Sequence, residues 1–299
     1  MLCERRTAKT LLAIEGAGLA TAAGSATGLA LTGASRYFVA PLALGLWGGA
    51  SLFTLSLLAD LYGVTAPEGG FGRAPRKLPR LVLETGARYV YDPQFRYRAF
   101  ASHGFRLDTR WLWLAPRIDV ALDARNRRYS LLAGHRLLGP SSAASAKSGT
   151  RVDLQLGVSD HDYGDEGFAM RIVEGSFAAR LDLEALGPTL RGSFAEAELG
   201  YAREISRFDG LPGEGSDELL ARGAFGGYIG QGQGEFKLSY EHRRDTLAGG
   251  LRMPGIGAGY LGFLSQRTEM YFGALGVASE VAYGSALMVS ALLLVRVGK

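Results

Sequence analysis

Hydrophobic and polar residues alternate one by one along most of the chain after residue 80. In the segment 81–91, apolar side chains recur at every second position, and Glu84 and Arg88 lie on the other face. The segments 151–159 and 235–241 repeat the pattern with different residues. A period of two is typical of a β-strand whose two faces meet different surroundings. The last two thirds of the chain are therefore predicted to be β-structure.

Turn residues divide this region into twelve predicted strands. Most of them are longer than the roughly 5–6 residues common in soluble proteins and reach the roughly 9–11 residues that cross a bilayer at a tilt. Prolines lie between the strands except for Pro116, where the alternation changes and we expect a β-bulge. The predicted strands are 80–91, 98–107, 110–122, 128–138, 150–159, 167–183, 190–202, 218–229, 234–243, 256–266, 268–277 and 280–297.

Two apolar segments, 11–34 and 37–62, precede the β-region. Each is long enough to cross a bilayer as a helix, and each carries one acidic residue, Glu15 or Asp60. Together they predict an apolar α-helical hairpin. Small residues four positions apart let helices approach closely. The predicted helix-packing residues are Gly24, Gly28, Gly45 and Gly49.

These features divide the chain into three parts. Residues 1–65 form the hairpin, which is a possible signal, anchor or partner-binding segment. Residues 66–79 are a linker rich in proline, glycine and basic residues, and residues 80–299 form the β-domain. Basic residues flank the hairpin on both sides, and the positive-inside rule would place both of its ends in the cytoplasm. An alternative architecture is therefore a β domain tethered to the inner membrane by two helices.

The composition further narrows the class of protein to which the chain can belong. Glycine makes up 43 of 299 residues without a collagen period, which fits tight turns and close strand contacts. The net charge of +4 is spread through alternating segments, whereas a nucleic-acid-binding protein gathers its basic residues on one face. We therefore expect no nucleic-acid partner. The single cysteine, Cys3, excludes an intramolecular disulfide.

The longer predicted loops follow alternate strands and so lie on one side of the predicted sheet. Gaps such as 160–166 and 203–217 follow odd-numbered strands, and most gaps after even-numbered strands are brief, apart from 139–149. With runs such as "RVDLQLGVS" and "EFKLSYE", residues 80–297 resemble the Gram-negative outer-membrane β-barrel proteins as a class. The resemblance implies an all-β transmembrane antiparallel barrel of about twelve strands in the outer membrane. One departure is the C-terminus, "ALLLVRVGK", which lacks the aromatic residue that commonly ends the last strand of such proteins.

In such a barrel the apolar faces contact lipid and the polar faces enclose a central space. Twelve strands enclose more space than side chains usually fill, so we expect a narrow passage or a plugged lumen. Trp111 and Trp113 are expected in an aromatic girdle at the membrane interface. The predicted lumen-lining residues are Glu84, Arg88, Asp153, Gln155, Arg180, Asp182, Glu196, Glu198, Glu235, Lys237, Ser239 and Glu241.

The stretch "SDHDYGDE" is the main candidate for other chemistry. Asp160, Asp162, Asp165 and Glu166 are oxygen ligands of the kind that Ca²⁺ prefers, although their spacing does not match the twelve-residue calcium loop. The alternative is a hairpin tip rich in turn formers. His161 beside an aspartate would also suit the activation of water.

The other three histidines share the apolar face of their strands by alternation, so we predict no catalytic residue. They are His103, His135 and His242.

The sequence thus predicts a non-enzymatic outer-membrane barrel, either a passive pore or the membrane-seated structural subunit of a larger assembly. The lipid bilayer is the expected partner, and a protein partner would bind through residues 11–62. Two alternatives stay open at this point. One is an outer-membrane enzyme acting on lipid or peptide through the acids of an outward loop, and the other is the β domain tethered to the inner membrane. No cofactor is expected, apart from the possible Ca²⁺.

Overall fold

Two helices precede the β-region in the computed structural model. The first, α1, spans Leu2–Leu31, and the second, α2, spans Val39–Thr65. By length and composition, α2 is the helix in the described part of the chain that qualifies to cross a membrane. The structure describes residues 2–33, 35, 37–67, 70–92, 96–145, 148–164, 167–209, 213–242, 264–283 and 287–298.

The described residues after the helices form twelve strands in one closed antiparallel barrel. Each strand pairs with the next, and β1 pairs with β12 from Leu81 opposite Val297 to Tyr91 opposite Leu287, which closes the sheet. The predicted fold class is confirmed. The strands are β1 (Leu81–Asp92), β2 (Arg96–Asp108), β3 (Leu112–Ala121), β4 (Arg127–Leu138), β5 (Arg151–Asp162), β6 (Phe168–Asp182), β7 (Ser193–Phe208), β8 (Glu214–Ile229), β9 (Gly234–His242), β10 (Leu264–Phe272), β11 (Leu275–Tyr283) and β12 (Leu287–Val297).

The outer surface of the barrel is largely apolar. Large hydrophobic side chains stand exposed at every second position, while their neighbours along the strand point inward. Soluble monomers rarely expose contiguous apolar patches beyond a few hundred Å². A closed sheet with such a surface has the alternation of a transmembrane barrel. The exposed outward residues include Leu83, Tyr89, Phe105, Leu114, Leu131, Leu156, Val173, Phe177, Leu199, Val277 and Leu293.

Several predicted strand boundaries were wrong. The predicted turn near residue 267 falls inside β10, and the chain turns instead at Gly273, whose φ of 61° is a left-handed conformation that glycine adopts readily. The predicted loop 203–217 is mostly strand, because β7 continues to Phe208 and pairs with β8 up to Ser206 opposite Glu214. Likewise, β5 continues past its predicted end at residue 159 and ends at Asp162. Alternation continues past these points, so it does not mark where a strand ends.

The prediction of a bulge at Pro116 was also wrong. Pairing between β2 and β3 is interrupted from Gly104 to Leu107, opposite Arg117 and Leu114, because proline offers no N–H to the ladder. The side-chain alternation nevertheless continues without a slip. Trp113 therefore lies inside the barrel with 1% of its surface exposed, whereas Trp111 lies before β3 and is 55% exposed. The interface position predicted for both tryptophans does not hold for Trp113.

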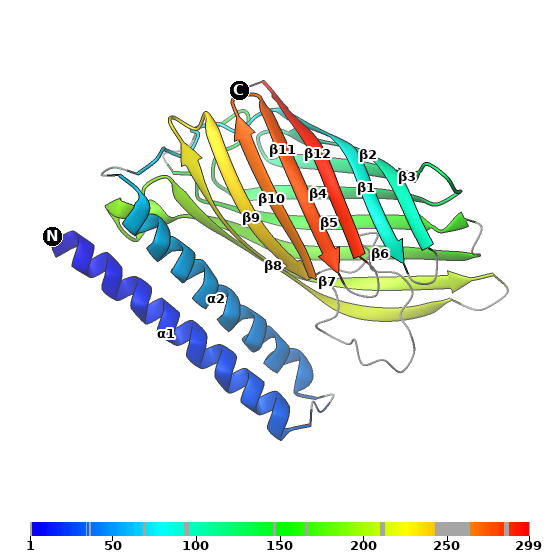
Figure 1. The fold of residues 1–299 in the computed structure, drawn as a ribbon, viewed down its shortest axis with the longest axis horizontal. Helices are drawn as coiled ribbons and strands as arrows, with labels where there is room; N and C mark the ends of the chain where they lie inside the picture. Colours follow the sequence, from blue (N-terminus) through cyan, green and yellow to red (C-terminus); the bar gives the residue numbers. More distant parts are fainter. Residues whose placement is uncertain are drawn as a thin grey trace.

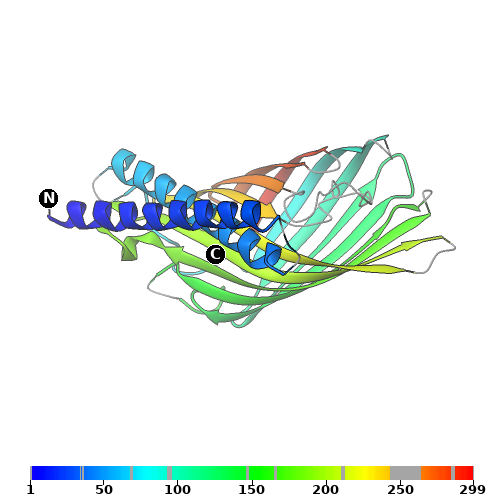
Figure 2. The same cartoon turned by 90° about the horizontal axis from the view of Figure 1, so that it is seen from below.

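The helical hairpin lies outside the barrel. Figures 1 and 2 show α1 and α2 side by side and antiparallel, beside β8 and clear of the lumen. Tyr62 and Ala59 of α2 pack with Phe225 on the outer face of β8 and with Leu190 of the short helix η3 (Pro188–Leu190). The polar interior offers no matching surface, so the apolar hairpin packs against the apolar wall.

Small residues line the contact between the two helices, here named the seam. A Cβ added at Gly49 would lie 2.5 Å from the backbone nitrogen of Ala22, and one added at Gly18 would lie 2.8 Å from the Gly49 carbonyl oxygen. Gly28 and Gly45 also face the opposite helix, against Leu42 and Ser25.

The role predicted for Gly24 was wrong, because a Cβ there would meet no described atom within 4 Å. Gly24 is one position away from Ser25, which lies in the seam seven residues after Gly18. A spacing of four residues finds neighbours on one helix but does not identify the face that meets the other helix.

Candidate functional site

The inward face of the barrel is the candidate site. All twelve predicted lumen residues lie on β1, β5, β6, β7 and β9 with their side chains on the inner side of the wall. Eight of them line a cavity of ≈ 410 Å³: Glu84, Arg88, Arg180, Glu198, Glu235, Lys237, Ser239 and Glu241. The other four, Asp153, Gln155, Asp182 and Glu196, are buried among interior polar groups.

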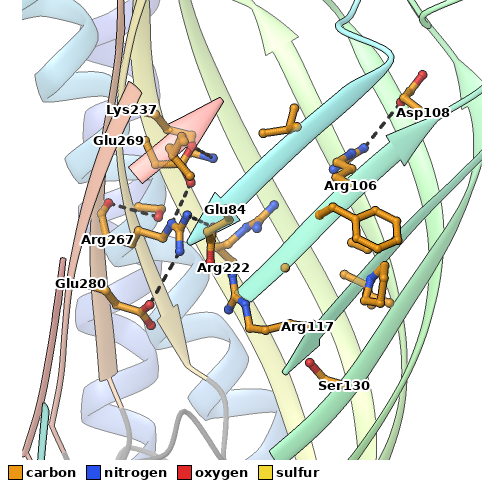
Figure 3. A pocket seen from close by; sticks show the side chains of 18 of the residues that line it. Glu84, Arg106, Asp108, Arg117, Ser130, Arg222, Lys237, Arg267, Glu269 and Glu280 are labelled. Atoms are coloured by element: carbon orange, nitrogen blue, oxygen red, sulfur yellow. Dashed lines mark hydrogen bonds and ion pairs between the residues drawn. The ribbon is translucent and has the colours of Figure 1, made fainter. Parts of the chain in front are cut away.

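One cluster of charges, the Glu84 network, consists of Glu84, Arg88, Arg117, Arg267 and Glu280. Glu84 on β1 accepts a hydrogen bond from Arg267 Nη2 on β10 at 2.7 Å and also pairs with Arg117 on β3. Arg88 Nη1 donates to Glu280 on β11 at 3.1 Å. Figure 3 shows Glu84, Arg117, Arg267 and Glu280 converging from different strands on the same space. The network therefore joins strands that do not neighbour one another in the sheet.

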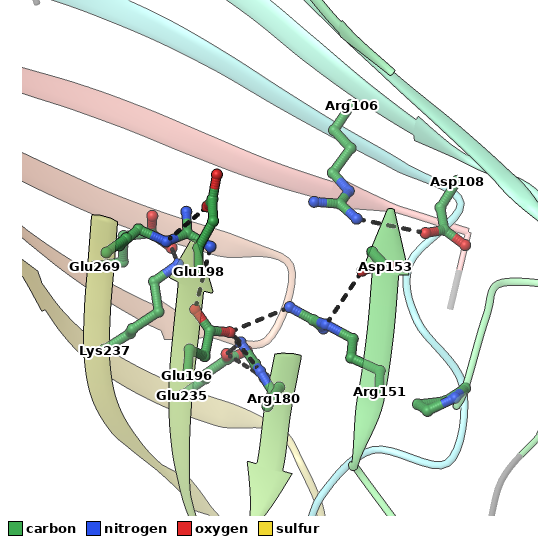
Figure 4. Close-up of polar contacts among 12 residues, drawn as sticks. Arg106, Asp108, Arg151, Asp153, Arg180, Glu196, Glu198, Glu235, Lys237 and Glu269 are labelled. Atoms are coloured by element: carbon green, nitrogen blue, oxygen red, sulfur yellow. Dashed lines mark hydrogen bonds and ion pairs between the residues drawn. The ribbon is translucent and has the colours of Figure 1, made fainter. Parts of the chain in front are cut away.

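A second cluster, the Glu196 network, consists of Arg151, Arg180, Glu196, Arg222 and Glu235. The Oε1 atom of Glu196 on β7 accepts from Arg180 Nε at 2.6 Å and from Arg151 Nη2 at 3.2 Å. Arg222 lies 3.7 Å from the other carboxylate oxygen, and Arg180 also reaches Glu235 on β9 at 3.3 Å. Figure 4 shows Arg151 and Arg180 reaching Glu196 from two different strands.

Glu235 extends the second network further, since it also pairs with Arg296 on β12. The chain of contacts from Arg180 through Glu235 to Arg296 links β6 to β12, which are separated by five strands along the sheet in either direction. Removing a charge from water costs several kcal/mol unless partners compensate. The interior arginines and carboxylates compensate one another, and their pairing draws side chains across the lumen.

The interior changes character toward the end where β1 finishes and β2 begins. There the inward side chains are apolar and tightly packed, with Phe100 2% exposed and Met288 0% exposed. Two such clusters lie at this end, one formed by Val90, Phe100, Ala121, Ala282 and Met288, and the other by Tyr163, Phe168, Met170, Ile172, Ala202 and Leu220. The water-accessible part of the described interior is therefore concentrated at the middle and at the opposite end.

That opposite end is crossed by the segment Gly70–Arg80, here named the strap. Gly72 forms a β-bridge with Gly230 in the turn between β8 and β9, and the Arg73 amide donates to the Gly230 carbonyl at 2.9 Å. Further along, the Leu78 amide donates to the Ser141 carbonyl in the loop between β4 and β5 at 3.2 Å. Because β4 and β8 are well separated around the barrel, the strap runs over the mouth (Figure 1). Pro75, Leu78 and Pro79 line the cavity from that side.

The residues of the "SDHDYGDE" stretch do not come together. Asp160 and Asp162 point outward from β5, where Asp160 pairs with Arg171 and Asp162 accepts from the Gly164 amide at 2.8 Å. His161 points inward, 1% exposed, with Nε2 2.9 Å from Asn126 Oδ1, so the water-activating pair does not form.

The calcium candidates Asp165 and Glu166 lie outside the described residues. Among the residues that the structure does describe, no group of three or more histidine, cysteine or acidic side chains is arranged to hold a metal ion. The described part of the stretch is the tip of a hairpin between β5 and β6.

The other histidines lie where the alternation puts them, with one difference. His103 and His135 are exposed on the outer face, and His103 Nδ1 lies 2.8 Å from Thr85 Oγ1. His242 has the outward parity of Tyr240 but is buried, with Nε2 4.0 Å from Glu218.

Sequence reasoning missed several members of the two networks and some of their neighbours. Arg267 was assigned to a turn, and Asp119, which lies 3.2 Å from Arg88 Nε, was obscured by the expected bulge. Arg222, by contrast, lies inside a correctly predicted strand, and its alternation with Leu219 and Ala221 would have identified it. The counter-ions were missed mainly because their partners lie on distant segments.

The sequence matches no protein-family model, and a search of curated proteins gives no match. Among solved structures, the chain is similar to a KdgM porin, with a TM-score of 0.40 and 8% identity over 71% of this chain and 98% of the porin. The β domain of the Bordetella autotransporter BrkA has a TM-score of 0.38 and 13% identity over 75% of this chain and 100% of its own. The outer membrane protein Omp33 of Acinetobacter baumannii has a TM-score of 0.36 and 7% identity over 73% of this chain and 98% of its own. At these identities the likeness does not extend to activity or substrate.

Proposed function

We propose that this chain is a non-enzymatic outer-membrane β-barrel that acts as a narrow passive pore for small hydrophilic solutes. The observation that carries the proposal is the cavity of ≈ 410 Å³, which is lined by charges of both signs inside a closed sheet with an apolar outer face. Closure leaves no unpaired edge strand in the described sheet, and a bilayer requires its spanning backbone to be paired in this way. Charged linings favour water and small ions over apolar molecules.

Three features support a narrow passage. The Glu84 and Glu196 networks draw side chains across the lumen, the strap crosses one mouth, and apolar clusters fill part of the other end. Because acids and bases face the same space, we expect weak selectivity between anions and cations.

Conductance in planar bilayers tests this proposal. The purified full-length chain is expected to give small conductance steps. Gly72→Val is expected to enlarge them, because a Cβ there would lie 2.6 Å from the Tyr228 carbonyl carbon and displace the strap. Gly48→Val is the control, since a Cβ at Gly48 would meet no described atom within 4 Å.

Two results would oppose the proposal. The absence of conductance from both the unmodified chain and Gly72→Val would exclude a pore, and recovery of the chain in the inner-membrane fraction would overturn the assigned compartment.

The hairpin supports a second candidate, a membrane-seated structural subunit. It lies outside the barrel with Leu12 and Leu19 of α1 68% and 56% exposed, so a partner helix would find an apolar surface there. A photo-crosslinker at Leu19 should then give one discrete protein adduct in intact cells, while one at Leu199 on the barrel wall should give none. Adducts with lipid at both positions would remove this candidate. We do not propose hydrolysis, because Asp160 and His161 point to opposite faces of β5.

A further inference from the structure

Exposed basic side chains gather at the strap end of the molecule. They come from three separate segments, namely the first turns of α1, the strap, and the turn between β2 and β3. The eight residues, here named the basic rim, are Arg5, Arg6, Lys9, Arg73, Arg76, Lys77, Arg80 and Arg110. Segments far apart in the sequence thus supply one kind of charge to one end.

Contacts between these segments place them at the same end. The Thr7 side chain of α1 packs against Gly187 in the connection between β6 and β7. The Tyr62 hydroxyl of α2 donates to the Arg191 carbonyl at 2.9 Å and accepts from the Phe71 amide at 3.3 Å, which fixes the start of the strap beside that connection. At the far end of the strap, the Arg80 carbonyl accepts from the Asp108 amide at 2.8 Å, next to the turn that carries Arg110.

The acidic side chains that the structure describes as exposed at this end are fewer than the eight basic ones. Asp60 is exposed at this end, and Glu184 is engaged with Arg191 at 2.6 Å. The opposite end differs, because its basic residues are interspersed with acids. There Arg171 pairs with Asp160 and Arg203 pairs with Asp217, and Asp123, Asp162 and Asp209 are exposed near Arg125, Arg127 and Arg207. Among the residues whose side chains are described, the excess of positive charge is therefore found at the strap end.

The basic rim borders the apolar outer surface. Arg80 directly precedes the first outward leucines of β1, and Arg110 and Trp111 directly precede Leu112 and Leu114 of β3, which are 57% and 44% exposed. The Arg110 guanidinium lies 4.9 Å from the Trp111 ring centroid. Tryptophan and basic residues at the edge of an apolar band are typical of the headgroup layer of a bilayer. If the apolar band lies in lipid, the basic rim lies at headgroup depth.

We propose that the basic rim binds the headgroups of anionic phospholipids in the leaflet that the strap end faces. This rests on the proposed insertion of the barrel into a bilayer. Basic side chains at a membrane surface attract anionic headgroups, and salt weakens the attraction within a Debye length. Four of the eight residues belong to the strap, so bound headgroups would also hold the strap over the mouth.

Fluorescence quenching by brominated lipids tests the proposal with the full chain. The protein is reconstituted in phosphatidylcholine that contains brominated phosphatidylglycerol or, in parallel, brominated phosphatidylcholine at the same fraction. The contribution of Trp111 is taken as the difference from Trp111→Phe. We expect stronger quenching of Trp111 by the anionic lipid, and we expect the difference to shrink as salt is added.

Two triple variants distinguish lipid binding by the basic rim from an effect of the overall positive charge of the protein. Arg76→Gln, Lys77→Gln and Arg80→Gln together remove three rim charges. Arg125→Gln, Arg127→Gln and Arg207→Gln remove three charges from the opposite end. The rim variant is expected to lower the relative affinity for phosphatidylglycerol at least about fivefold, the effect of one surface basic residue. The control variant is expected to retain the relative affinity for phosphatidylglycerol of the unmodified chain.

Three other outcomes would contradict the proposal. Equal quenching by both lipids, or equal losses in both variants, would show that the basic rim does not bind anionic headgroups. If added lipid A displaces brominated phosphatidylglycerol from Trp111 more effectively than unbrominated phosphatidylglycerol does, the basic rim prefers lipid A phosphates and the assignment to phospholipid is overturned. Absence of quenching by either lipid would show that the chain is not inserted, which refutes the proposed function itself.

Discussion

Replacing Glu196 with glutamine tests whether the interior ion pairs stabilise the barrel. The substitution keeps the shape of the side chain and removes one negative charge from the Glu196 network. Arg180 and Arg151 share one carboxylate oxygen of Glu196 at 2.6 Å and 3.2 Å, and glutamine would offer them only a neutral amide oxygen in its place. Both Arg180 and Glu196 are nearly inaccessible, with side chains 6% and 4% exposed, so water replaces the lost partner poorly.

Breaking a buried pair costs about 3–5 kcal/mol when a charge is left without compensation. Arg180 keeps Glu235 at 3.3 Å, which places the expected loss at the lower end of this range. We therefore expect Glu196→Gln to lower the free energy of unfolding by about 3 kcal/mol. Urea unfolding of the refolded barrel in detergent micelles, followed by tryptophan fluorescence and by gel mobility, measures this free energy.

The matched control is Glu184→Gln, which also removes one acidic charge. Glu184 pairs with Arg191 at 2.6 Å, but its side chain is 43% exposed, and exposed pairs contribute about 1 kcal/mol or less. The two variants should therefore differ by about 2 kcal/mol. If Glu196→Gln is no more destabilising than Glu184→Gln, the interior pairs are effectively solvated and the reasoning from burial fails.

Two further substitutions test how the hairpin is attached. Gly49→Val should separate the helices, because a Cβ would lie 2.5 Å from the Ala22 backbone nitrogen, and overpacking costs about 1–3 kcal/mol. The measurement is disulfide cross-linking between cysteines placed in the two helices, and Gly24→Val should leave the yield unchanged. Tyr62→Phe removes the hydroxyl that donates to the Arg191 carbonyl at 2.9 Å, and we expect a loss of about 1 kcal/mol and faster proteolysis of the strap. A strap cleaved at the same rate in both proteins would show that this hydroxyl does not anchor it.

The interior of the barrel combines charged networks with packed apolar clusters. Charged networks occupy the middle and the strap end, and packed apolar side chains occupy part of the other end. Arg180 also lies over the Phe194 ring at 3.8 Å and Arg296 over the Tyr271 ring at 3.3 Å, so aromatic faces help to hold the guanidinium groups in place. Both arginines line the cavity.

The sequence by itself determined the class of fold, because strand alternation is a local property. Each run of apolar and polar residues, such as 151–159, fixes which side chains share a face without reference to any other strand. The same reasoning identified the apolar hairpin from two long apolar segments, each with a single acidic residue. It also identified twelve inward polar residues, since alternation needs no knowledge of their partners.

Only the tertiary structure decided which residues meet. Arg267 and Glu84 are 183 positions apart, and Arg296 and Glu235 are 61 apart, so no local pattern pairs them. Strand ends were equally undetermined, because alternation continued past the predicted turns until a glycine such as Gly273 allowed the chain to reverse. The seam that uses Gly18 and excludes Gly24 likewise depends on how one helix is rotated against the other. Pairing, register and rotation are set by the closure of the whole barrel and by packing against its wall, and these are properties of the assembled chain.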